Sequence, residues 1–255
     1  MHIRTSIGLT VVALGLGVCP SLFAVSYTWD FTGSAGSNCT GSPTSCSTSA
    51  GNSMVFNATP GGGPAIKATA WYLNGSNTFQ KATLGQYSSG LGVCYPGENC
   101  TQPDHQVDNN GFDEYVLFEF ATPVDPSTVH ITSTSGGDLD ASYFLGGTGG
   151  QNMNLTGLTT ASLSGLGFGA INDDLGTASG SRDVSLLSGL PPGPVNAILF
   201  GAKYGNTDDF FKIGTMGGST SSPVPEPSSV ILLFTIALLG FKLSRRPKMS
   251  QGIAR

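Results

Sequence analysis

The chain has 255 residues, 37 glycines and a formal net charge of −5 at pH 7. Between Val25 and Val224 only five basic residues stand against fifteen acidic ones, so no basic stripe is available to replace the counterions of phosphates. This balance argues against a nucleic-acid partner and suits an exported protein that stays soluble or gathers divalent cations.

Residues 1–24 have the three parts of a secretory signal peptide. Arg4 supplies the positive start, residues 7–18 are apolar, and a cleavage point follows Ala24. Leu22, three residues before that point, is bulkier than usual, which leaves the exact cleavage site open by a few residues. The segment predicts export through the inner membrane.

Residues 25–215 predict one secreted all-β domain, because short apolar or alternating runs are separated throughout by Gly, Asn, Ser and Pro. In the run 114–120, Val116, Phe118 and Phe120 share one face while Tyr115 and Leu117 share the other, which predicts a central strand. The roughly ten-residue spacing of such runs favours an antiparallel β-sandwich of the jelly-roll kind. The Gly-rich segment 146–180 fits either a pair of edge strands or a long excursion. The predicted strands cover residues 27–31, 53–57, 65–73, 78–87, 114–120, 128–133, 141–145, 183–187, 197–203 and 210–213.

Four cysteines follow the signal peptide, and their even number in an oxidising compartment predicts disulfides. Nearness in sequence favours the pairs Cys39–Cys46 and Cys94–Cys100 among the three pairings that four cysteines allow. A zinc site is the alternative, but the spacings differ from the short C-x₂₋₄-C pairs of such sites.

Acidic and amide side chains gather near predicted strand ends, and their oxygens are the ligands that Ca²⁺ prefers. Ca²⁺ is the one candidate cofactor, and a further acidic pair occurs at 208–209. The alternative is that these residues close turns by accepting backbone hydrogen bonds. The predicted metal ligands are Asp104, Asp108, Asn109, Asp138 and Asp140.

Motifs that carry catalysis are missing from the sequence: there is no G-x-S-x-G elbow, no H-E-x-x-H and no Walker loop. A carboxylate pair such as Asp108 with Glu119 would suit glycoside hydrolysis, but acidic residues are common throughout this chain. We therefore expect a domain that is not an enzyme. Trp29 and Trp71 fit either a sugar-stacking platform or the core of the sheet.

The C-terminal segment has a distinct order of parts. Residues 216–223, almost all small and polar, predict a flexible linker. The stiff hinge Val224-Pro225-Glu226-Pro227 follows, then an apolar run that predicts a transmembrane helix over about 229–243, then a basic cytoplasmic tail with Arg245 and Arg246. A buried core helix is the alternative for the apolar run.

This hinge, apolar run and arginine pair resemble the PEP-CTERM sorting signal, residues 224–255, of Gram-negative bacteria. The resemblance implies processing by exosortase, a membrane protease-transpeptidase, and an ectodomain at the cell surface or outside the cell. Gly90-Leu91-Gly92-Val93, His105 with Asp108-Asn109, and the run 113–120 are similar to the middle of exosortase-dependent surface proteins whose β domains have no defined activity.

The role expected from this resemblance is structural or adhesive, at the cell surface or in the extracellular matrix. The alternative is a carbohydrate-binding module for exopolysaccharide, and a glycoside hydrolase comes last. The expected partners are exosortase, the inner membrane before processing and, under the alternative, an exopolysaccharide.

Overall fold

The computed structural model describes residues 22–33, 36–37, 52–98, 105–133, 136–148, 150–176, 180–186 and 194–223. The chain divides into two units, one of residues Val25–Thr220 and one that combines Met1–Ala24 with Ser221–Arg255. Most of the predicted signal peptide, the predicted transmembrane helix and the sorting tail lie outside the described residues. Among the residues described, no helix is long and apolar enough to cross a membrane.

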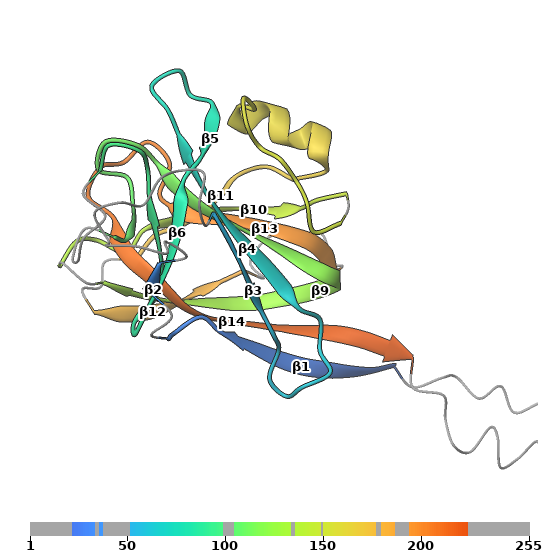
Figure 1. Ribbon diagram of the computed structural model, residues 1–255. Coiled ribbons are helices and arrows are strands. Elements are labelled where there is room, and N and C mark those ends of the chain that lie inside the picture. Colours follow the sequence, from blue (N-terminus) through green and yellow to red (C-terminus); the bar gives the residue numbers. More distant parts are fainter. Residues whose placement is uncertain are drawn as a thin grey trace, which may run out of the picture. The chain divides into compact units, whose positions relative to one another are not determined.

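The described part is built almost entirely of antiparallel strands, which confirms the all-β class (Figure 1). The strands join one continuous sheet whose longest path runs β11-β10-β13-β9-β14-β7-β6-β2. Within the described residues, one 3₁₀ helix, η2 (Thr160–Leu166), stands outside the sheet. The strands are β1 (Leu22–Asp30), β2 (Gly36–Ser37), β3 (Ser53–Phe56), β4 (Ile66–Leu73), β5 (Phe79–Lys81), β6 (Thr83–Tyr87), β7 (Gly90–Cys94), β8 (Val107–Asp108), β9 (Glu114–Ser133), β10 (Ala141–Gly146), β11 (Asn172–Asp174), β12 (Ser181–Ser185), β13 (Val195–Ala202) and β14 (Phe210–Pro223).

Strand β9 connects the two halves of this sheet. Its first part pairs with β4 and β13, for example Phe118 with Ile198, whereas its last part pairs with β12 and β14, for example Ile131 with Ile213. The predicted strands 114–120 and 128–133 are therefore one strand that passes from one half to the other. The prediction of a central, doubly buried strand at 114–120 is confirmed, since every residue of it is buried.

The main hydrophobic core draws side chains from both halves of the sheet. Val116, Phe118 and Phe120 of β9 pack with Ile213 of β14 and other buried residues. The ring of Phe118 stacks on Phe31 with centroids 5.0 Å apart. Full burial of each such side chain stabilises the fold by about 1.5–3 kcal/mol.

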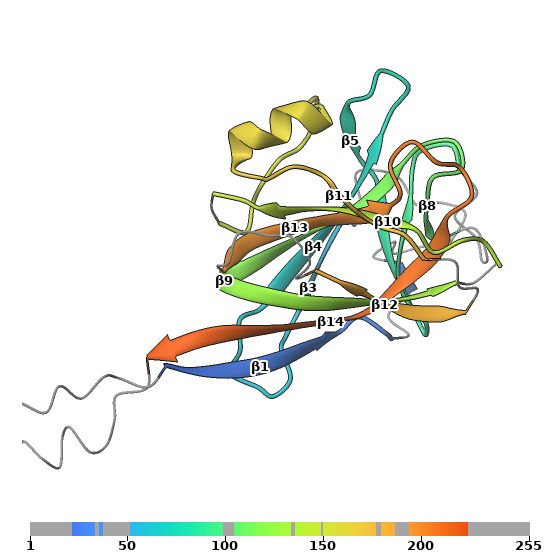
Figure 2. The same cartoon turned by 180° about the vertical axis from the view of Figure 1, so that it is seen from behind.

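A second apolar cluster lies on the other face of β9, where Tyr115 and Leu117 pack with Leu163 of η2. The described residues of the segment 146–180 thus form an excursion that covers this face and also contributes the short strand β11 (Figure 2). Thr159 caps η2 through its hydroxyl, which accepts from the Ser162 N–H, and Gly167 ends the helix with φ 81°.

The prediction of a flexible linker at 216–223 is wrong, because these residues form the end of β14. Met216 pairs with Val129 and Ser219 with Asp125 of β9. A run of small polar residues lacks the alternation of apolar side chains that predicts a strand. Its backbone nevertheless pairs with β9. At Gly218 a Cβ atom would lie 2.9 Å from Val124, so a side chain there would crowd β9.

The predicted boundary at Ala24 also falls inside a strand, since β1 begins at Leu22 and pairs with β14. The cleavage site itself stays a prediction, as does the jelly-roll sandwich.

Candidate functional site

The polar segment 105–114 contributes to two separate groups of side chains, although Asp108 and Asn109 are adjacent in sequence. Asn109 contacts Asp209, which directly precedes β14. Asp108 lies instead in β8 and contacts Glu114. The structure therefore divides the predicted metal ligands between two places.

The first group, the acidic cluster, consists of Asp138, Asp140 and Asp209. One carboxylate oxygen from each of these residues lies within 4.8 Å of the others. Asp209 is fully buried, and its carboxylate accepts from Asn109 Nδ2 at 2.6 Å and from the Asp140 N–H at 3.0 Å. Burial raises the pKa of Asp209 to about 6, against the lowering effect of the Asn109 hydrogen bond. Three converging carboxylates form an oxygen-rich set that suits Ca²⁺.

The structure brings two of the predicted ligands together, Asp138 and Asp140, with Asn109 beside them. Asp104 lies outside the described residues, and the contacts of Asp108 belong to the other group. Asp209 was missed as a ligand, although the acidic pair at 208–209 signalled it. An isolated parallel β-bridge pairs the backbones of Asp138 and Asp209 and so brings the cluster together. The spacing of these residues in the sequence does not predict this pairing.

The second group, the buried polar group, consists of Asp108, Glu114 and Lys212, with the half-buried Tyr87 beside Lys212. Glu114 Oε2 accepts from the Asp108 N–H at 3.3 Å, and Lys212 Nζ lies 4.1 Å from the centre of the Tyr87 ring. Burial raises the pKa of Glu114 well above its ordinary value. Burial also lowers the pKa of Lys212 to about 8, although Glu114, Asp108 and Glu98 pull it upward.

Close backbone packing holds this buried polar group. A Cβ atom at Gly92 of β7 would lie 2.1 Å from the His105 carbonyl oxygen and 3.0 Å from Lys212 Nζ. Gly92 therefore lets His105 and Lys212 approach β7 closely, and Gly90 lets the backbone of Ile213 do so. These contacts tie the polar segment to the sheet.

The other sequence candidates have structural contacts. Glu119 Oε1 accepts from the Met153 N–H at 2.7 Å, whereas Asp108 contacts Glu114 and Asn110. The two carboxylates suggested for hydrolysis thus take part in different sets of contacts. Trp29 and Trp71 are buried in the core, so neither forms an exposed stacking platform.

The cysteine pairs stay a prediction. Cys94 is buried at the end of β7. Cys39, Cys46 and Cys100 lie outside the described residues.

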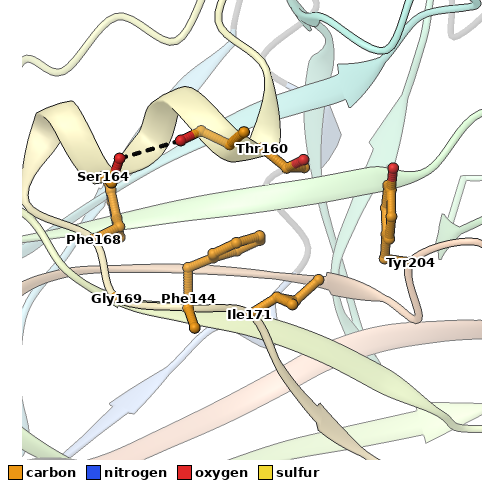
Figure 3. Close-up of a pocket in the computed structure, with 9 residues that line it drawn as sticks. Phe144, Thr160, Ser164, Phe168, Gly169, Ile171 and Tyr204 are labelled. Atoms are coloured by element: carbon orange, nitrogen blue, oxygen red, sulfur yellow. Dashed lines mark hydrogen bonds between the residues drawn. The ribbon is translucent and has the colours of Figure 1, made fainter.

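A pocket of about 400 Å³ lies between η2, β10 and the turn after β13 (Figure 3). Sequence reasoning missed it, because its walls come from three distant segments. It is lined by Phe144, Thr160, Ala161, Ser164, Phe168, Gly169, Ala170, Ile171 and Tyr204.

Comparison with known families places a PEP-CTERM protein-sorting motif at residues 223–246. The chain is therefore a PEP-CTERM sorting-signal protein, and the motif implies export and exosortase-dependent localisation at the cell surface or outside the cell. The matched range contains the Pro-Glu-Pro hinge and the Arg245-Arg246 pair. No curated protein and no solved structure is significantly similar to the chain.

Proposed function

We propose that the β domain has a structural or adhesive role at the cell surface or in the extracellular matrix. The observation that carries this proposal is that the sorting motif begins at Pro223, the last residue of β14. The cargo of the sorting signal is then the β unit Val25–Thr220, and two residues separate its last residue from the motif. We assign the unit a sandwich architecture, because both halves of its sheet contribute to one core.

The positions of the ionisable groups support a role without catalysis. Glu114 and Lys212 lie in the interior with Asp108, and Asp209 accepts hydrogen bonds from Asn109 and the Asp140 N–H. Groups held in this way shape loops and strand ends and keep the domain rigid. We also propose that the acidic cluster binds Ca²⁺, which would offset the repulsion among its carboxylates.

The sorting step is tested with two tags, one in the exposed turn at Gly61 and Gly62 and one after Arg255. The first tag is expected at the cell surface without the second, because processing separates them. Glu226→Ala should leave both tags together in the membrane fraction. If the two tags still separate normally in Glu226→Ala, the proposal that processing requires the Pro-Glu-Pro motif is wrong.

The role of the domain is tested separately with a chimera that keeps both terminal signals and replaces residues 25–220 by an unrelated secreted domain. Cells that make the chimera are expected to lose matrix mass or surface attachment relative to cells that make the natural chain. Equal matrix and attachment in both strains would contradict the structural role while leaving the sorting intact.

A second candidate function, carbohydrate binding, is favoured by one specific observation. Tyr204 is 37% exposed and forms one wall of the pocket beneath η2. An exposed aromatic ring beside a concave surface is suited to the apolar face of a sugar ring.

A further inference from the structure

The pocket beneath η2 differs chemically from the rest of this acidic domain. Its lining contains no Asp, Glu, Lys, Arg or His. Most of the lining is apolar, and the side chains of Thr160, Ser164 and Tyr204 supply hydroxyl groups. A ligand that fits this surface is uncharged and has both apolar and hydrogen-bonding parts.

The mouth of the pocket exposes apolar surface to solvent. Ile171 and Tyr204, each 37% exposed, are two of the four exposed large hydrophobic residues in the described part of the chain. Phe144 beneath them is only 3% exposed. Exposed apolar side chains that gather around a cavity mark binding sites more often than scattered ones do.

Two hydrogen bonds fix the position of Tyr204 before any ligand arrives. Asn77 Nδ2 donates to the Tyr204 hydroxyl at 3.1 Å, and the Tyr204 N–H donates to Ser142 Oγ at 2.9 Å. Asn77 has φ 57°, and within the described residues it is the one non-glycine residue with a positive φ. Such conformations collect at functional sites, where the surrounding structure holds them. A preset aromatic wall reduces the entropy lost on binding.

We propose that this pocket binds a neutral N-acetylated hexose. The apolar face of the sugar ring would pack on Tyr204, and the acetyl methyl would contact Phe144 and Ile171 (Figure 3). The hydroxyls and the amide of the sugar would bond to Thr160 and Ser164. The Ser164 hydroxyl donates to the Ala161 carbonyl at 3.1 Å and can still accept from a ligand, and an amphipathic sugar uses both the apolar and the hydroxyl surface of the pocket. This inference rests on the second candidate function.

The test measures binding of N-acetylglucosamine and of glucose to the secreted, processed protein by calorimetry and saturation-transfer NMR. N-acetylglucosamine is expected to bind at least about tenfold more tightly than glucose, since its methyl buries further apolar surface. Its acetyl protons should show the strongest transfer. Equal affinities would overturn the assignment of the acetyl group, and binding of neither sugar would overturn the site.

Variants locate the site. Tyr204→Ala is expected to weaken binding by about tenfold or more, whereas Tyr204→Phe should retain most of it. Leu175→Ala is the matched control, because Leu175 is 67% exposed and is not part of the pocket lining. Unchanged binding by Tyr204→Ala would overturn the proposal. Sugar binding by the purified protein does not depend on the structural role, so failure of that role and failure of the sugar site are distinguishable.

Discussion

Replacing Lys212 by methionine is expected to stabilise the domain at neutral pH. Lys212 lies in β14, its side chain is buried, and within the described residues Nζ makes no hydrogen bond. It faces the ring of Tyr87 at 4.1 Å. Methionine has a similar length and can keep the contact with this ring, and it carries no charge into the interior.

The magnitude follows from the pKa of Lys212, which burial lowers from 10.5 to about 8. Each unit corresponds to about 1.4 kcal/mol, so the charged lysine costs the folded state about 3 kcal/mol at pH 7. Between pH 8 and 10.5 the unfolded chain holds a proton that the folded protein has lost. Stability therefore rises with pH in this window, and the whole penalty is present below it.

Urea unfolding of the secreted, processed protein at pH 7 and pH 9 measures both effects. Lys212→Met is expected to gain about 1–3 kcal/mol over the natural protein at pH 7, and this gain should shrink by about 1 kcal/mol at pH 9. Lys81→Met, at an exposed lysine of β5, is the control and should change stability by less than about 0.5 kcal/mol. A loss of stability in Lys212→Met, with the same pH dependence as the natural protein, would refute the reasoning. It would mean that Glu114, Asp108 and Glu98 offset the desolvation of the ammonium.

Excess Ca²⁺ should raise the melting temperature, because a bound ion adds about 2.7 kcal/mol at a hundredfold excess over Kd. Asp138→Asn should abolish the rise, and an equal response to Mg²⁺ would indicate simple screening of charge. Gly92→Ala should lower the free energy of unfolding by about 1–3 kcal/mol, since its Cβ would overlap the His105 carbonyl oxygen, whereas Gly165→Ala, with open space around it, should not. Unreduced peptide mapping should find Cys94 linked to Cys100, and loss of this link should lower stability by at most about 2–3 kcal/mol. A free thiol at Cys94 would contradict that pairing.

The sequence alone predicts features that depend on residues close together in the chain, namely the sorting motif and the central strand. The hinge at Pro225, Glu226 and Pro227 and the basic residues behind it form one contiguous pattern, and the family match covers the same stretch. The run 114–120 reveals a doubly buried strand because successive side chains point to opposite faces, a period that needs no partner to be visible.

The contacts between segments far apart in the sequence are visible only in the tertiary structure. Asn109 and Asp209 are 100 residues apart and join through the packing of the 105–109 segment against the start of β14. The end of β14 has no apolar alternation, so its strand state depends on backbone bonds to β9 rather than on its own side chains. Adjacent residues such as Asp108 and Asn109 belong to different clusters for the same reason: strand pairing over long separations, not local spacing, sets which polar groups converge.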